Sequence, residues 1–468
     1  MNEFGAMTLW ELSENIRRKK ISAVEATVGY LERIRALNDK VNAFVTVVEE
    51  DAIAAAEEAQ AEIHKGNYRG PLHGIPIGHK DLYWTKGVRT TAGSRLHKDF
   101  IPDRDATVVA RYRAAGAVML GKLNTHEFAY GPTNENSMFG PSRNPWNTAH
   151  ISGGSSGGSG AAVQLGLCAG ATGSDTGGSI RIPSACCGIV GLKPTYGRAS
   201  RHGIFPLCWS MDHPGPMTRT VRDAALMLQP IAGYDADDPA TVERQVPDYM
   251  AALRDDLTGL RVGIPSQYFY DQADPDVEAA TRAAVERLAD LGAEVREVEI
   301  AHIQHSAAAA LTIYLAEATA YHDDTQLSHA ELYTDQVRTF IELGNYVLAK
   351  DYLHAQRFRR LLGAAVHSVL SLCDVLVTPT LPIVATAIGQ ENVTVRGVNQ
   401  SVFSALLRNT EPFNLTGLPA LAVPCGFSTA GLPISLQIVG RPFDEATVLG
   451  VGHAYQEATE WHQRRPQP

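Results

Sequence analysis

The sequence predicts an α/β protein whose large sheet is mostly parallel and which forms a single domain over residues 1–468. Short apolar runs alternate with helical patterns along most of the chain, an order typical of parallel sheets with crossover helices. No internal repeat or low-complexity linker divides the chain. At a typical length of roughly 150 residues per domain the chain would have three domains, but large α/β enzymes often have longer domains.

The first 65 residues are expected to form N-terminal helices. Thr8 and Ser22 each stand three residues before a glutamate, Glu11 and Glu25. This is the capping-box pattern, in which a hydroxyl and a carboxylate satisfy the first free N–H groups of a helix. After Ser22, apolar residues recur at helical spacing. The sequence therefore predicts two helices that begin next to these hydroxyl residues.

Residues 70–220 contain many of the glycines of the chain, and we treat this segment as the candidate catalytic region. Here apolar runs predict strands and longer periodic stretches predict helices. The helix predicted over 157–167 consists of small residues, which allow close packing on a sheet. The expected strands are 74–77, 117–120 and 167–172, and the expected helices are 106–115 and 157–167.

The second half divides into a peripheral, mainly helical layer (about 230–370) and a C-terminal part of sheet and helix (371–468). Asp274 is placed to cap a helix, and Pro275 suits its first position. The expected strands are 260–264, 374–378, 421–424 and 434–439, and the expected helices are 275–291, a helical run from about 303 to 370, and 445–457.

Composition and charge exclude several functions. The net charge of −10 and the pI of about 5.9 argue against a nucleic-acid binder, which usually has a basic face. No stretch reaches the ~18 apolar residues that span a bilayer, and the N-terminus lacks a signal-peptide pattern. Six cysteines without a CxxC motif indicate reduced thiols in a cytoplasmic protein. No metal-ligand spacing stands out.

Three polar residues with glycines around two of them carry the chemistry: Lys80 in GIPIGHKD (74–81), Ser155 in SGGSSGGSG (152–160) and Ser179 in GSDTGGSIR (173–181). Glycines before Ser179 allow consecutive N–H groups to point at one place, as an oxyanion hole requires. Lys80 follows an apolar run, and burial would lower its pKa enough for it to act as a base. Together they supply a base, a relay hydroxyl and a nucleophile for acyl transfer.

Each motif also has a plainer interpretation: a turn, a flexible Ser/Gly linker, or a lysine paired with Asp81. The segment 153–157 also fits the G-x-S-x-G nucleophile elbow, which would make Ser155 the nucleophile with partners such as Asp374 and His453.

The segment 116–122 matches the phosphate-loop spacing G-x4-G-K. We reject it because Leu123 stands where Mg²⁺ binding needs Ser or Thr.

Taken together, these segments resemble the amidase signature family. The likeness covers most of the chain and is densest from Gly74 to about Arg219. It continues in GLKPT (191–195), GPMTRT (215–220), NLTGLPA (414–420) and PISLQIVG (433–440). The resemblance implies one α/β/α domain around a large mixed, mostly parallel sheet.

The resemblance also implies a Ser–cis-Ser–Lys triad that needs no metal or cofactor. Ser179 would be the nucleophile, and neutral Lys80 the base. Ser155, joined to Gly154 by a cis peptide bond, would carry the proton between them. The N–H groups of Thr176, Gly177, Gly178 and Ser179 would hold the oxyanion. His79 departs from the family, which often has an apolar residue before the lysine, and could change local polarity.

Family resemblance does not fix the substrate. Phe128, Tyr130, Met138 and Trp209, with Phe139 and Phe205, could line the mouth of the site, although core packing explains each one alone slightly better. Together they favour a small-molecule apolar or aromatic amide, with an ester or aryl carbamate (urethane) as a variant. A homodimer is possible.

Two rivals remain. The first is the A-type component of a glutamyl-tRNA amidotransferase, but segment 403–413 is more similar to stand-alone amidases. The second is an inactive binding or scaffold relative, which would be expected to have lost Lys80, Ser155 or Ser179. All three are present.

Overall fold

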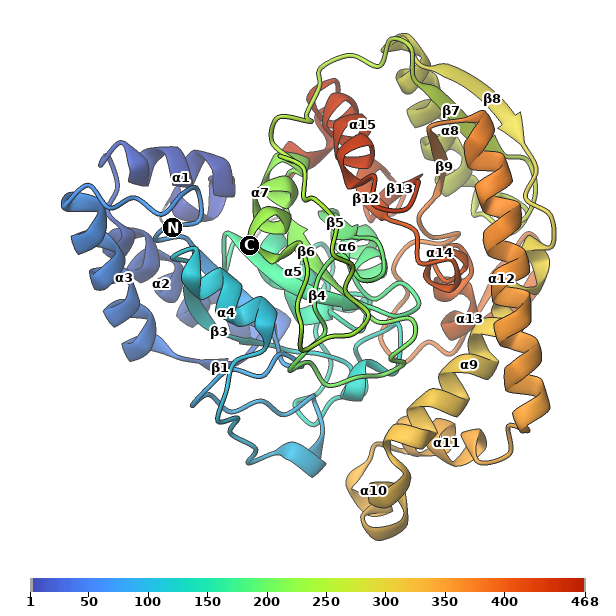
Figure 1. Ribbon diagram of the computed structural model, residues 1–468, viewed down its shortest axis with the longest axis horizontal. Coiled ribbons are helices and arrows are strands. Elements are labelled where there is room, and N and C mark those ends of the chain that lie inside the picture. Colours follow the sequence, from blue (N-terminus) through green and yellow to red (C-terminus); the bar gives the residue numbers. More distant parts are fainter. Residues whose placement is uncertain (1–2, 467–468) are drawn as a thin grey trace.

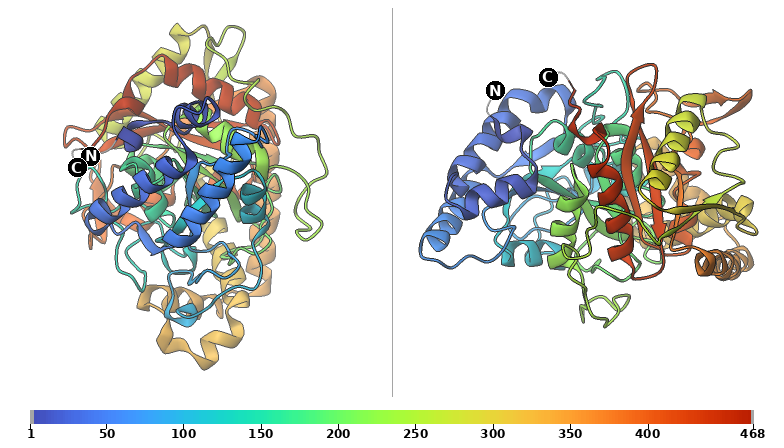
Figure 2. Two further views of the ribbon diagram at one scale, coloured as in Figure 1. Left: turned by 90° about the vertical axis from the view of Figure 1, so that its left-hand side faces the viewer. Right: turned by 90° about the horizontal axis from the view of Figure 1, so that it is seen from above.

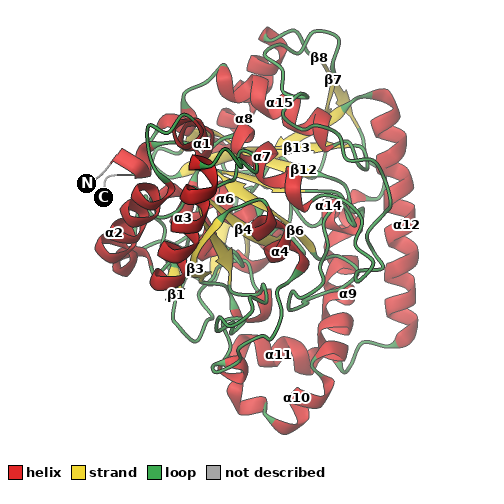
Figure 3. Cartoon of the chain, turned by 60° about the vertical axis from the view of Figure 1, so that its left-hand side comes forward, coloured by secondary structure: helices red, strands yellow, loops and turns green. Residues whose placement is uncertain are grey.

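Eleven strands form one sheet through the middle of the molecule in the computed structural model, which describes residues 3–466 (Figure 3). Their order across the sheet is β1-β3-β2-β4-β6-β5-β12-β13-β9-β7-β8, and β10 and β11 form a separate hairpin. The strands are β1 Phe44–Val47, β2 Pro76–Lys80, β3 Val118–Leu123, β4 Gly170–Asp175, β5 Val190–Lys193, β6 His213–Thr218, β7 Arg261–Pro265, β8 Glu294–Val298, β9 Val375–Pro379, β10 Asn392–Val395, β11 Val398–Ser401, β12 Ala420–Phe427 and β13 Pro433–Gly440.

The sheet is mixed. Parallel pairing joins β3, β2 and β4 on one side and β9, β7 and β8 on the other. The strands between them pair antiparallel, as does β1 with β3. The α/β class and the large mixed sheet are confirmed, and the antiparallel centre is an addition that strand–helix alternation could not indicate.

Helices cover both faces of the sheet. On one face α5 and α6 pack together, and on the other α7 packs against α4 and α15. The described helices are α1 Leu9–Arg17, α2 Ala23–Val41, α3 Glu49–His64, α4 Thr107–Ala114, α5 Gly157–Gln164, α6 Arg181–Cys187, α7 Val221–Ile231, α8 Pro275–Asp290, α9 Ser306–Tyr321, α10 Asp323–Ser328, α11 Asp335–Gly344, α12 Ala349–Leu372, α13 Val402–Leu407, α14 Pro412–Leu415 and α15 Glu445–Glu457.

The periphery is helical at both ends of the sheet. Helices α1 to α3 lie at one end, while α11 and α12 each pack on α9 at the other (Figure 1). The described chain ends lie close together on the side of α1 and α2 (Figure 2). Although β7 and β8 belong to the segment 230–370, they extend the main sheet rather than the helical layer.

Local sequence signals account for many helix ends. Both capping boxes are present at Thr8 and Ser22. Asp274 caps α8 by accepting a hydrogen bond from the Asp276 N–H, with Pro275 in the first turn. Helix α15 begins and ends where the sequence predicts.

Several strands lie where the sequence pattern does not predict them. The first 65 residues include β1 as well as helices, and β5, β6 and β8 are further additions. Strand β6 contains Pro214 and Pro216, which normally argue against a central strand because proline cannot donate a ladder hydrogen bond.

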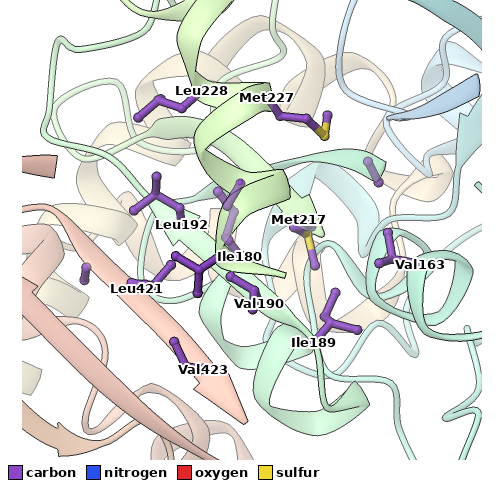
Figure 4. Packing of buried hydrophobic residues seen from close by; sticks show 14 of the residues in the cluster. Val163, Ile180, Ile189, Val190, Leu192, Met217, Met227, Leu228, Leu421 and Val423 are labelled. Atoms are coloured by element: carbon purple, nitrogen blue, oxygen red, sulfur yellow. The ribbon is translucent and has the colours of Figure 1, made fainter. Parts of the chain in front are cut away.

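The apolar core continues directly beneath the candidate site. Ile180, which follows Ser179, is fully buried in it together with Met217 and Leu192. Figure 4 shows these side chains between α7 and the strands, with Leu421 nearby. The loop that carries Ser179 is therefore anchored in well-packed structure.

Candidate functional site

Lys80 is the last residue of β2 and is fully buried. Its Nζ lies 2.7 Å from Ser155 Oγ and 2.9 Å from Ser174 Oγ. Burial holds the pKa of Lys80 well below its usual value, and the nearby charges of Asp175 and Asp212 offset only part of this effect. The structure thus places a lysine with a lowered pKa against two hydroxyl groups.

Ser155 lies in the loop that leads into α5, and its peptide bond with Gly154 is cis. The Ser155 carbonyl accepts a hydrogen bond from the His126 N–H at 3.0 Å. The next residue, Ser156, donates its N–H to the Ser179 carbonyl at 3.3 Å. The two serine loops are therefore joined through their backbones.

Ser179 follows the end of β4 and precedes α6, and only 5% of its surface is exposed. Gly178 has φ of +144°, a conformation open chiefly to glycine. Within residues 3–466, no hydrogen bond occupies the N–H groups of Gly177, Gly178 or Ser179. These free donors in one turn can stabilise negative charge on a substrate oxygen.

A buried ion pair supports this turn. Arg181 binds both carboxylate oxygens of Asp175 at 3.0 and 2.9 Å, and Asp175 also accepts the Ile180 N–H at 3.1 Å. Burial opposes ionisation of Asp175, but the charge and hydrogen bonds of Arg181 outweigh it and hold the pKa of Asp175 below its usual value. Arg181 also donates to Asn414 Oδ1 and Gln437 Oε1, each at 2.6 Å.

Asp212 holds the other end of the turn. Thr176 Oγ1 donates to Asp212 Oδ1 at 2.6 Å, and the N–H groups of Leu207 and Cys208 donate to the same carboxylate. Burial raises the pKa of Asp212 to about 6 against these hydrogen bonds. A segment distant from Ser179 in sequence is thereby fixed next to it.

Two cavities adjoin at Ala129, Thr176 and Leu207. The larger, which we call the outer cavity, has a volume of about 220 Å³, and the smaller, the inner cavity, has about 20 Å³. The outer cavity is bounded by Ser174, Arg201, His202, Ile204, Phe205, Trp209, Asp212, His213 and Asp237 among others. The inner cavity is bounded by Tyr130, Gly131, Pro132, Gly177, Ser179, Tyr314, Phe403 and Leu407 in addition to the shared residues.

The aromatic residues singled out from the sequence separate into three groups. Phe205 and Trp209 line the outer cavity, and Tyr130 lines the inner one. Phe128 is fully buried behind this wall, with its ring 4.4 Å from that of His322. Met138 and Phe139 line neither cavity.

Several residues of the site have no clear sequence signal. Ser174 lies within the motif 173–181 that contains Ser179, but nothing in the sequence pattern distinguishes Ser174 as a functional residue. Asp212, Tyr314 and Leu407 come from distant parts of the chain, so only the fold brings them together.

His79 is buried, and burial lowers its pKa to about 3. It is therefore neutral at ordinary pH. Its ring lies among Tyr83 and Tyr112. Because His79 is neutral, it changes the local polarity less than a charged histidine would.

The structure does not bring together the residues of the nucleophile-elbow interpretation. Asp374 pairs with Arg261 and Arg441, each at 2.9 Å. His453 lies 3.8 Å from Glu457. Neither contacts Ser155, which faces Lys80.

Lys122, from the rejected phosphate-loop match, is buried and donates to the Tyr83 carbonyl and to Thr85 Oγ1. All six cysteines are free and buried. Within residues 3–466 no cluster of three His, Cys, Asp or Glu side chains could hold a metal ion, and no helix there is long and apolar enough to cross a bilayer.

Comparison with known proteins identifies the family of the chain. The family model described as Amidase matches residues 25–449. An amidase of Pseudomonas putida is 46% identical over 100% of this chain and 99% of its own. The A component of the glutamyl-tRNA(Gln) amidotransferase of Methylococcus capsulatus is 44% identical over 98% of each chain. A solved structure described as a vestigial protein complex that reveals the evolutionary origins of an s-triazine catabolic enzyme superposes with a TM-score of 0.93 at 36% identity, over 96% of this chain and 98% of that one.

These matches define an enzyme that hydrolyses amide carbon–nitrogen bonds. More specifically, the chain belongs to the amidase signature family.

Proposed function

We propose that this protein is a stand-alone amidase in which Ser179 is the nucleophile, Ser155 the proton relay and Lys80 the base. The observation that carries the proposal is the buried Lys80 Nζ at 2.7 Å from Ser155 Oγ. A lysine whose pKa is lowered by burial can accept a proton near neutral pH.

The proposed reaction assigns one step to each of these residues. Ser179 Oγ attacks the carbonyl carbon while its proton passes to Ser155, whose own proton passes to Lys80 Nζ. The substrate oxygen gains negative charge next to the free N–H groups of Gly177, Gly178 and Ser179. Collapse breaks the C–N bond, and the proton returns through Ser155 to the departing nitrogen. Water then hydrolyses the acyl-enzyme and restores Ser179.

Ser174 has a supporting place in this scheme. Its Oγ lies 2.9 Å from Lys80 Nζ, so a neutral amine can donate to Ser174 while it accepts from Ser155. This would fix the direction in which the lone pair points.

The amidotransferase component is the second candidate because several relatives with that name match nearly the whole chain. Glutamine carries an ammonium and a carboxylate group, and burying them without partners is costly. The inner cavity next to Ser179 has no charged side chain in its wall. This favours the stand-alone amidase, acting in the cytoplasm on a small amide, ester or carbamate. A homodimer stays a prediction.

The test is the Ser179→Ala variant and intact-protein mass spectrometry with an activated ester. We expect the acyl mass on Ser179 in the parent protein, none in the variant, and turnover reduced by at least ~10³-fold. The Ser156→Ala variant is the matched control in the neighbouring glycine-rich loop and should keep the adduct. Retained turnover by Ser179→Ala, or an adduct on Ser155, would refute the assignment. Glutamine-dependent transfer requiring partner proteins would instead support the second candidate.

A further inference from the structure

The two cavities differ tenfold in volume, and this difference bears on which half of the substrate each one takes. Resting on the proposed function, we infer that the outer cavity receives the amine half of the substrate and the inner cavity a short, uncharged acyl group. The substrate class is then an N-aryl amide of a small acid, with an aromatic amine that carries no negative charge.

The orientation follows from where the proton is delivered. During C–N cleavage Ser155 returns a proton to the departing nitrogen. Ser155 shares Lys80 Nζ with Ser174, and Ser174 lines the outer cavity but not the inner one. The departing nitrogen therefore faces the outer cavity. The acyl group, which stays bonded to Ser179, occupies the inner cavity that Ser179 itself lines.

The size limit comes from the inner cavity. A single water needs roughly 10–15 Å³ on this measure, so about 20 Å³ leaves room for a group of one or two carbons. The cavity wall is braced from outside. Phe340 packs at 5.1 Å from both Tyr130 and Phe403, and the Tyr314 hydroxyl donates to the Thr176 carbonyl at 3.4 Å. A longer acyl chain would have to displace packed aromatic rings.

The wall of the outer cavity contains both aromatic and acidic residues. Its one arginine, Arg201, is already bound to both carboxylate oxygens of Asp238, at 2.6 and 3.0 Å. Asp212 and Asp237 also line the cavity, so carboxylates outnumber cations there. Phe205 and Trp209 offer apolar surface for a ring. An anionic amine would meet repulsion, whereas a neutral aromatic amine would not.

The first experiment compares kcat/KM for two matched sets of substrates. Acetanilide, butyranilide and hexananilide vary only the acyl half, while benzamide has a large acyl half and releases ammonia. We expect kcat/KM to fall by about tenfold or more from the acetyl to the hexanoyl compound, since one unsuitable methylene costs that much in a tight pocket. Benzamide should be poorer than acetanilide. Faster cleavage of hexananilide or benzamide than of acetanilide would overturn the inference.

Variants on each side should act separately. Leu407→Ala enlarges the inner cavity and should narrow the acetyl-to-hexanoyl ratio about tenfold, with little change in preference among amines. Trp209→Ala, on the outer side, should change the preference among ring-substituted acetanilides and leave the acyl-length ratio unchanged. If Trp209→Ala alters acyl-length preference and Leu407→Ala does not, the orientation is reversed and the inference fails.

The charge argument has its own test. The para-carboxylate of acetanilide should be cleaved about tenfold or more slowly than the para-carboxamide, and Asp237→Asn should reduce that gap. Equal rates for the two compounds would refute the charge preference.

An activated acetyl ester separates this inference from the proposed function. An acetyl adduct on Ser179 together with preference for long acyl groups defeats only the inference. No adduct on Ser179 and no turnover of any compound defeats both.

Discussion

Replacing Gly178 by alanine tests whether the turn before Ser179 is the oxyanion site. Gly178 has φ of +144°, and a Cβ there would lie 2.4 Å from Thr410 Oγ1 and 2.7 Å from Ile182 Cδ1. The isoleucine tip can move, but the threonine hydroxyl is held by hydrogen bonds to the carbonyls of Gly177 at 2.5 Å and Leu407 at 3.1 Å. The turn must therefore shift.

Two costs follow from that shift. Forcing a non-glycine residue into this backbone conformation costs about 1–3 kcal/mol, and losing the Thr410 hydrogen bond adds about 1 kcal/mol. Displacing one oxyanion donor lowers kcat by about 10²–10³-fold. We expect a modest fall in melting temperature and a much larger fall in kcat, with KM changed little.

The assay is steady-state kinetics on acetanilide combined with calorimetric melting. Gly363→Ala is the matched control, because Gly363 lies within α12 and an added Cβ there meets no atom within 4 Å. It should keep kcat and gain up to about 1 kcal/mol in stability. The double variant Gly178→Ala/Thr410→Ala should recover part of the stability but little of kcat. A folded Gly178→Ala enzyme with kcat within about threefold of the parent, far short of the loss expected for a displaced oxyanion donor, would refute the oxyanion role.

Two further predictions concern pH. Lys80 must be neutral to accept a proton, so kcat/KM should rise with pH as Lys80 loses its proton. Because burial lowers the pKa of Lys80, this rise should occur at a pH well below the range of an exposed lysine. A pH–rate profile whose rise begins only above about pH 10, the range of an ordinary lysine, would contradict this prediction. Burial raises the pKa of Glu411 to about 8, so the folded state binds more protons than the unfolded state between about 4.5 and 8, and stability from this group falls across that range by up to about 1.4 kcal/mol per pH unit. Glu411→Gln should flatten that dependence in urea titrations at about pH 5 and about pH 8, and an unchanged difference between the two would count against it.

How far the sequence reaches depends on the range of the interactions. The N-terminal ends of α1, α2 and α8 follow from a cap within three residues, so they could be predicted. Lys80, Ser155 and Ser179 lie in short motifs whose patterns are local, and the structure places Lys80 against Ser155. Predictions from such local patterns need no knowledge of the tertiary fold.

What could not be predicted depends on distant partners. Strand β6 carries two prolines that mimic a loop, and only its pairing with β4 and with Val190 and Gly191 of β5 makes it a strand. The same holds for the inner cavity, whose wall takes Tyr314 from α9 and Leu407 from α13. Phe128 illustrates the converse, since its sequence context suggests a pocket wall while the fold buries it entirely.

The separate origins of the site's two parts have a consequence for how such a protein can change over evolutionary time. The residues proposed to break the amide bond lie at the end of a strand or in loops that are anchored in the core, where Ile180 ties Ser179 to the packed interior. Replacements there lower the stability of the fold. Part of the wall of the inner cavity belongs to helices α9 and α13 at the edge of the fold. Mutations in those helices can remodel the acyl-binding surface while the reactive groups stay in place, so a lineage can explore new amides without first rebuilding its chemistry.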